Sequence, residues 1–133
     1  MPENEHGKNQ EIAMLESLKA ISASIEPDPL RVEGSYVLTF PFEGGKTTIR
    51  IALKDQSGDL VITNMTTLPD SKKGKGHGSD ALGRVLAWAN EHGLQSIRAT
   101  QVQKESENFW AKNGFEKDPE HSQTNDFVLK PKE

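Results

Sequence analysis

The chain has 133 residues, 33% hydrophobic and 27% charged, and this length suits one domain with its own core. The formal net charge of −4 gives no support to nucleic-acid binding, and the absence of cysteines excludes disulfides and thiolate metal sites. No stretch approaches the roughly 18 apolar residues of a membrane span, and the N-terminus lacks the apolar core of a secretion signal. We therefore expect a cytoplasmic protein without a nucleic-acid, membrane or metal partner.

Residues 1–9 carry almost no apolar side chains and are expected to form a disordered tail, with a single domain over residues 10–133. A helix is predicted at about residues 10–25, where apolar residues recur at helical spacing. The Glu-Pro-Asp-Pro segment that follows should end this helix, because each proline biases the preceding residue away from the helical conformation.

Three strand-like runs come next, at Ser35–Pro41, Lys46–Leu53 and Leu60–Leu68. Polar turns that contain glycine separate them, and the second run alternates clearly between two kinds of side chain. Three consecutive strands joined by short turns predict an antiparallel meander.

A polar, glycine-rich stretch from Ser71 to Gly78 leads into a predicted helix from about Ser79 to His92. Its apolar residues form a stripe expected to face the core: Leu82, Val85, Leu86 and Ala89. Gly93 suits the left-handed position that ends such a helix, and Leu94–Thr100 is the next predicted strand. A strand, a helix and a second strand in this order form a crossover unit, so the two strands should be parallel.

The rest of the chain predicts a short helix at Glu105–Asn113 that stops at Gly114, a strand that starts at Phe115, and a last strand at Asn125–Leu129. The predicted fold class is therefore α/β (α+β). It has a mixed sheet in which an antiparallel meander is followed by a parallel β-α-β unit, with helices packed on the sheet.

The segment Lys73–Gly78, with the sequence Lys-Gly-Lys-Gly-His-Gly, is the most informative part of the chain. Its three glycines let the backbone approach a ligand closely and turn several N–H groups toward one point. The helix that follows adds its positive N-terminal end, and the lysines add full positive charge. Together these features predict a loop that binds a pyrophosphate.

Two well-known phosphate loops do not fit this segment. A dinucleotide fingerprint requires G-x-G-x-x-G, but counting from Gly74 the third glycine falls one residue early, at Gly78. A P-loop could end at Gly45-Lys46-Thr47, but Phe40 stands where its first glycine would be.

The loop resembles the acyl-CoA loop of the GNAT superfamily of N-acetyltransferases, written Q/R-x-x-G-x-G/A, with Lys73 at the first position and Gly76 and Gly78 at the two fixed glycines. Family members place this loop between a strand and a helix, follow it with a parallel strand, and then carry a short helix ending in Y-x-x-x-G-F. Here the corresponding segment is Phe109–Phe115, which ends in Gly-Phe in register. The resemblance covers about residues 35–129.

This resemblance implies an N-acetyltransferase that transfers an acetyl group from acetyl-CoA to a primary amine, a protein or peptide amine included. Backbone N–H groups of the loop would bind the pyrophosphate, and the end of the third strand of the meander would bind the pantetheine arm and polarise the thioester carbonyl. Gln103 would supply an amide where the family often has asparagine. The residues implied to contact acetyl-CoA are Thr66, Thr67, Leu68, Lys73, Gly74, Lys75, Gly76, His77, Gly78, Ser79, Gln103 and Trp110.

Some of these residues also fit plainer roles. The side chains of Thr66 and Thr67 fit solvent-facing strand positions, Gln103 fits an exposed polar loop residue, and His77 is interpreted as a packing or phosphate-side residue before a catalytic one.

Trp110 stands where the family commonly has the tyrosine that protonates the departing thiolate. An indole N–H can donate a hydrogen bond but does not release a proton near neutral pH. No general base is identified: Glu105, Ser106 and Glu107 are candidates, but each also fits a solvated residue at a helix start. A GNAT-fold acyl-CoA-binding protein with little or no catalysis is therefore the alternative, and the oligomeric state, a homodimer included, is left open.

Overall fold

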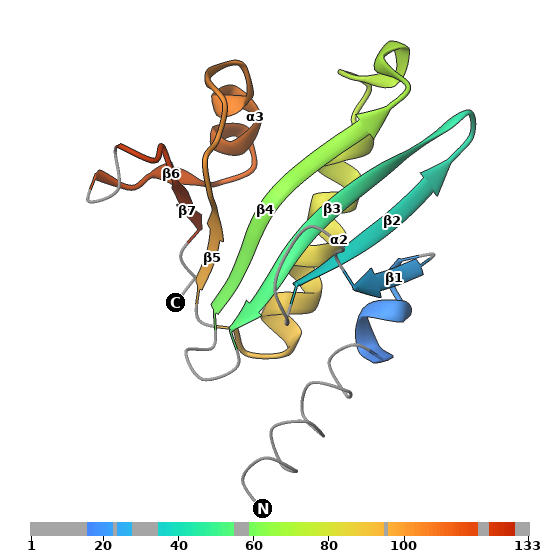
Figure 1. The fold of residues 1–133 in the computed structure, drawn as a ribbon, viewed down its shortest axis with the longest axis horizontal. Coiled ribbons are helices and arrows are strands. Elements are labelled where there is room, and N and C mark those ends of the chain that lie inside the picture. Colours follow the sequence, from blue (N-terminus) through green and yellow to red (C-terminus); the bar gives the residue numbers. More distant parts are fainter. Residues whose placement is uncertain are drawn as a thin grey trace, which may run out of the picture.

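The computed structural model describes residues 16–22, 24–27, 35–54, 59–94, 96–119 and 123–129. Within these ranges the strands form one seven-stranded sheet of order β1-β2-β3-β4-β5-β7-β6 (Figure 1). The strands are β1 (Ser24–Pro27), β2 (Ser35–Phe42), β3 (Gly45–Lys54), β4 (Asp59–Leu68), β5 (Ser96–Ala99), β6 (Glu116–Lys117) and β7 (Phe127–Leu129). The helices are α2 (His77–Glu91) and α3 (Glu107–Lys112), with 3₁₀ turns at Asp70–Lys72 and Lys104–Ser106.

The predicted meander and the predicted parallel pair are both confirmed. Strands β2, β3 and β4 pair antiparallel in sequence order, and β5 pairs parallel with β4. Along β3 the side chains of Thr47, Ile49 and Ile51 are buried, as expected for a strand with one face on the core. The result is the mixed α+β sheet that the sequence predicts.

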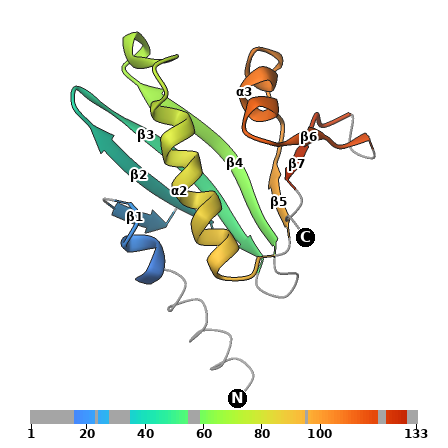
Figure 2. The ribbon, with the colours of Figure 1, turned by 180° about the vertical axis from the view of Figure 1, so that it is seen from behind.

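Helix α2 crosses one face of this sheet and covers its centre (Figure 2). Its buried residues are Ala81, Leu82, Val85, Trp88 and Ala89. The stripe predicted from the sequence is confirmed at three of its four positions, while Leu86 is only partly buried. Trp88 donates a hydrogen bond from Nε1 to Ser17 Oγ at 2.7 Å, which attaches the residues before β1 to the helix.

Strands β4 and β5 stay paired only at the beginning of β4. Ile51 pairs with Ile62 and Arg50 with Asn64, so Thr63 is an extra residue with no opposite residue in the β3 register. The pairing with β5 reaches Ile62, and β4 then continues to Leu68 without it. A bulge of this kind bends a strand and increases its twist, so β4 diverges from β5 beyond this point (Figure 1).

The N-terminal helix prediction is wrong at its end. Residues 16–19 are helical, but Ser24–Pro27 form the edge strand β1, in which Ile25 pairs with Leu38 of β2. Ile25 continues the helical spacing of the preceding apolar residues, but pairing with β2 gives its backbone hydrogen-bond partners and still packs its side chain against the core. The predicted tail and the beginning of this helix lie outside the described residues, as does the turn at residues 55–58.

Other boundaries differ by one or two residues. Helix α2 begins at His77 rather than at Ser79, so Gly78 belongs to its first turn and not to the loop. Strand β5 is limited to Ser96–Ala99, and the last strand begins at Phe127. No helix in the described ranges is long and apolar enough to span a membrane.

Candidate functional site

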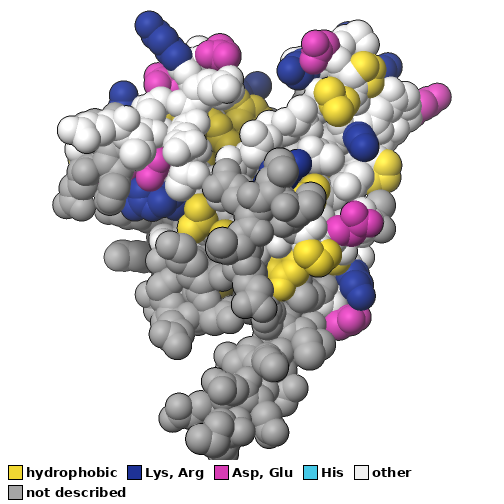
Figure 3. Space-filling model, in the orientation of Figure 1, with side chains coloured by type: hydrophobic (Ala, Val, Ile, Leu, Met, Phe, Trp, Pro, Cys, Tyr) yellow, Lys and Arg dark blue, Asp and Glu magenta, His cyan; other side chains and the backbone are white. Residues whose placement is uncertain are grey.

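A cavity of about 730 Å³ lies where β4 and β5 diverge. Its walls are residues 62–67 of β4, the loop before α2 with that helix's first turn, the end of β5 with the residues that follow it to Gln103, the 3₁₀ turn at Lys104–Ser106, and α3. Figure 3 shows the molecule hollowed between the part formed by α3 and the part formed by the far ends of β2, β3 and β4, with hydrophobic side chains in the hollow. Lys and Arg side chains stand on both sides of it.

The first turn of α2 contributes free backbone donors to this cavity. In the part of the chain that the structure describes, no group accepts a hydrogen bond from the N–H groups of residues 76–79, and no side chain caps the helix. The first bond within the helix runs from the Asp80 N–H to the Gly76 carbonyl at 3.0 Å. A helix N-terminus needs acceptors for these donors, and its dipole favours an anion. Gly76, Gly78 and Ser79 line the cavity, so an anion bound there would meet them.

The three glycines of the Lys73–Gly78 segment have two different roles. Gly74 and Gly76 have φ angles of +77° and +91°, in the left-handed region that favours glycine, and a Cβ on either would meet no atom within 4 Å. Gly78 instead allows close packing, because a Cβ there would lie 3.2 Å from Met65 Cε and 3.5 Å from Phe109 Cε1. The absence of a side chain at Gly78 thus lets α2 approach both β4 and α3.

Two lysines line the cavity from opposite walls. Lys73 belongs to the loop before α2, and Lys112 is the last residue of α3. Lys73 Nζ lies 3.1 Å from Asp70 Oδ1, but both side chains are largely exposed, so this pair holds Lys73 only weakly. Both cations can therefore turn toward a bound polyanion. Among the described residues, no group of three or more His, Asp or Glu side chains could hold a metal ion.

Most of the residues implied to contact acetyl-CoA line this cavity. They are Thr66, Thr67, Lys73, Gly74, Gly76, Gly78, Ser79, Gln103 and Trp110. Leu68 and Lys75 are exposed and lie outside its lining. The His77 ring also lies outside it and stacks on Phe42 with centroids 3.6 Å apart and planes 2° from parallel. His77 therefore packs α2 against the end of β2.

The three candidates for a general base are separated by the fold. Glu105 and Ser106 line the cavity. The Glu107 carboxylate points elsewhere, because its Oε2 accepts a hydrogen bond from Asn125 Nδ2 at 2.8 Å.

Trp110 contributes to the core and to the cavity wall at once. Its side chain is buried, and its ring contacts those of Phe109 and Phe115 edge to face, with centroids 5.3 and 4.9 Å away. No hydroxyl stands at this position to donate a proton, as the sequence indicates.

Several lining residues were missed by reasoning from the sequence. They are Ile62, Thr63, Asn64, Met65, Ala99, Thr100, Gln101, Val102, Asn108, Phe109 and Lys112. Phe109 and Lys112 stand beside Trp110 in the sequence, so the helix motif could have pointed to them. The residues after β5 enter the cavity only because the strands diverge, and nothing local in the sequence marks that divergence.

Neither a family model nor a curated protein matches this sequence significantly. Solved structures do match the fold. A Klebsiella pneumoniae protein assigned as an acyl-CoA N-acyltransferase matches 90% of this chain and 88% of its own, with a TM-score of 0.62 and 16% identity. Nourseothricin acetyltransferase matches 74% of this chain with a TM-score of 0.58 and 15% identity. The PaiA N-acetyltransferase of Thermoplasma acidophilum, in complex with coenzyme A, matches 64% with a TM-score of 0.54 and 16% identity.

Other matching structures carry the GNAT family in their names. At these identities the likeness establishes the fold, and the chain has the GNAT fold that the two sequence motifs indicate. The chain spans 66% of the length of nourseothricin acetyltransferase and 53% of the length of PaiA, so parts of both enzymes lie outside the matched region.

Proposed function

We propose that this protein is an acetyl-CoA-dependent N-acetyltransferase that transfers the acetyl group to a primary amine, a peptide or protein amine included. The observation that carries the proposal is the row of uncapped N–H groups of residues 76–79, which opens into the cavity between the diverging strands of a GNAT fold. The coenzyme A in the PaiA structure supports the same class of ligand.

The lining of the cavity fits the parts of an acyl-CoA. The pyrophosphate belongs at the first turn of α2, where the backbone donors and the helix dipole favour negative charge. Lys73 and Lys112 supply positive charge beside it. The pantetheine arm then follows β4 along the gap, with the Gln103 amide opposite. A volume of about 730 Å³ lies within the range of ordinary ligand sites, about 300–1,000 Å³.

The proposed reaction is a direct attack on the thioester. The amine nitrogen bonds to the carbonyl carbon, the carbon–sulfur bond breaks, the sulfur leaves as thiolate, and the amine proton passes to water or a base. Thr66 and Thr67 of β4 line the wall along which the arm runs, and a hydrogen-bond donor beside the carbonyl polarises it as an oxyanion-type group. Trp110 cannot protonate the leaving sulfur, and the absence of a general acid typically lowers a rate by about 10² to 10⁴. Turnover is still feasible because a free thiol has a pKa of about 8.5, which makes the thiolate a tolerable leaving group.

Trp110 also favours the second candidate, a GNAT-fold protein that binds acyl-CoA with little or no catalysis. Its indole fills the tyrosine position with an apolar ring packed against two phenylalanines. Such a ring can line the site of a bound pantetheine without any proton transfer.

The test measures amine-dependent release of coenzyme A thiol together with mass spectrometry of the amine. The panel should include peptides with a free N-terminus, peptides with an internal lysine, and small primary amines. We expect acetylated product with at least one class of amine, and much less with the Gly76→Val variant at the same acetyl-CoA concentration. Tight acetyl-CoA binding without turnover of any amine would favour the binding protein, and no binding would reject both candidates.

A further inference from the structure

The segment that follows β5 holds a non-glycine residue in an unusual backbone conformation. Gln101 has a φ of +52°, in the left-handed region that residues with a side chain rarely adopt. Such conformations persist only where the surrounding structure holds them, and they concentrate at functional sites.

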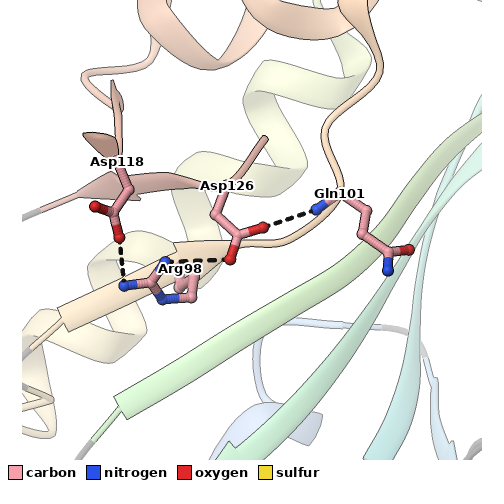
Figure 4. Close-up of polar contacts among 4 residues, drawn as sticks. All are labelled: Arg98, Gln101, Asp118 and Asp126. Carbon is pink, nitrogen blue, oxygen red and sulfur yellow. Dashed lines mark hydrogen bonds and ion pairs between the residues drawn. The ribbon is translucent and has the colours of Figure 1, made fainter. Parts of the chain in front are cut away.

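A buried carboxylate fixes the backbone of Gln101 (Figure 4). Asp126 Oδ1 accepts the hydrogen bond from the Gln101 N–H at 3.1 Å, and Oδ2 accepts one from Arg98 Nη1 at 3.2 Å. Arg98 in turn lies 2.9 Å from Asp118 through Nη2. Only 8% of the Asp126 side chain is exposed, so this carboxylate is held in place and cannot swing away from Gln101.

The next residue is held from the same turn before β7. The Val102 N–H donates to the Asn125 carbonyl at 3.0 Å, and Asn125 Nδ2 donates back to the Val102 carbonyl at 2.6 Å. Asn125 itself has a φ of +54°. Residues 101–102 are thus attached by main-chain and side-chain bonds to residues 125–126, and they form a firm wall of the cavity.

Gln101 lies at the closed end of the gap between the strands. The Thr100 N–H donates to the Ile62 carbonyl at 3.1 Å, and Gln101 is the first residue beyond this link between β5 and β4. Gln101 lines the cavity, and Figure 4 shows its side chain extending away from Asp126 toward β4. In the described part of the chain, no group forms a hydrogen bond with its side-chain amide.

We propose that Gln101 binds the acyl end of the bound thioester, with its side-chain N–H donating a hydrogen bond to the thioester carbonyl oxygen. The inference rests on the proposed function. An arm that starts at the first turn of α2 and follows β4 from Met65 toward Ile62 brings its far end to Gln101. An uncharged amide donor there stabilises the oxygen as negative charge develops during attack. Asp126 acts as a positioning residue, through the Gln101 backbone.

The experiment compares the affinities for acetyl-CoA and for coenzyme A, which lacks the carbonyl, by titration calorimetry. Gln101→Gly accepts the positive φ and removes the amide, while Gln101→Asn keeps an amide in a residue that tolerates this conformation. Gln123→Gly, in an exposed turn outside the cavity, is the control. We expect Gln101→Gly to lower the affinity for acetyl-CoA about fivefold, which corresponds to the loss of one hydrogen bond. The affinity for coenzyme A should fall less than twofold. Gln101→Asn should recover part of the loss.

An equal loss of affinity for both ligands, or no loss for either, would overturn the role of Gln101. Asp126→Ala removes the acceptor of the Gln101 N–H and should move the ratio of the two affinities toward that of Gln101→Gly. Because the readout is binding, it is separate from turnover. If acetyl-CoA binds but no amine is acetylated, catalysis is refuted while the affinity ratio still decides the role of Gln101. If neither ligand binds, both proposals fall.

Discussion

Asn113, just after α3, donates a hydrogen bond from Nδ2 to Ser79 Oγ in the first turn of α2, at 3.3 Å. The same amide donates to the Phe109 carbonyl at 2.8 Å, within its own helix. The first bond joins the end of α3 to the first turn of α2, so it helps to fix the position of the donors expected to meet the pyrophosphate.

The first prediction follows from this connection. Asn113→Ala should lower the free energy of unfolding by about 1 kcal/mol, the usual net value of a hydrogen bond. It should also lower the affinity for acetyl-CoA severalfold. Asn90→Ala, on the exposed side of α2, should change neither quantity. Denaturant melts measure the free energy of unfolding, and titration calorimetry measures the affinity for acetyl-CoA. Stability loss without any change in affinity would mean that Asn113 serves the fold alone.

The second prediction separates backbone strain from ligand binding. Gly76 and Gly93 flank α2 at its two ends, both have a positive φ, and both have open space where a Cβ would stand. Valine at either position should destabilise the fold by a similar amount, about 1–2 kcal/mol. Only Gly76→Val should also lower the affinity for acetyl-CoA, by tenfold or more, because it displaces backbone N–H groups that bond the charged pyrophosphate. Equal affinities of the two variants would show that the loop is a surface feature.

The third prediction concerns Lys73 and Lys112. Replacing either lysine with alanine should lower the affinity for acetyl-CoA. It should also reduce the dependence of this affinity on salt concentration, since salt screens the attraction between a cation and a phosphate. Lys117→Ala, on β6 outside the cavity, is the matched control. An unchanged salt dependence in both variants would remove these lysines from the binding site.

The sequence predicts the fold well where a periodic pattern coincides with a buried face. The alternation that buries Thr47, Ile49 and Ile51 reveals β3 directly, and the helical stripe of α2 is equally clear. Strand β1 is missed because Ile25 fits both helical spacing and an edge strand, and only its pairing with β2 decides between them.

The residues of the candidate site that belong to a local motif are predicted from the sequence, whereas those placed by strand register are missed. The glycine loop is visible as a motif, and most of its residues reach the cavity. Gly78 also packs on Met65 and Phe109, and this contact between three separate elements is not visible in the sequence. The bulge at Thr63 and the position of Gln101 follow from strand pairing, which no local pattern in the chain specifies.

The fourth prediction tests the missing general acid. Trp110→Tyr should place a phenol, which can transfer its proton, beside the sulfur of the thioester. Where departure of the thiolate limits turnover, we expect kcat to rise by up to about 10², the low end for general-acid catalysis. The smaller ring leaves space beside Phe109 and Phe115, so stability should fall. Weaker acetyl-CoA binding with no gain in kcat would assign the indole to packing against the pantetheine arm.

Binding of acetyl-CoA itself tests the central claim most directly. Titration calorimetry, with thermal melts at increasing ligand concentration, should give one acetyl-CoA per chain and a rising Tm. Mass action predicts about 2.7 kcal/mol of added stability when the ligand is at a hundred times its Kd. The Gly76→Val variant should show much less of both effects. An absence of heat and of any change in Tm at millimolar acetyl-CoA would contradict the assignment of the cavity as an acyl-CoA site.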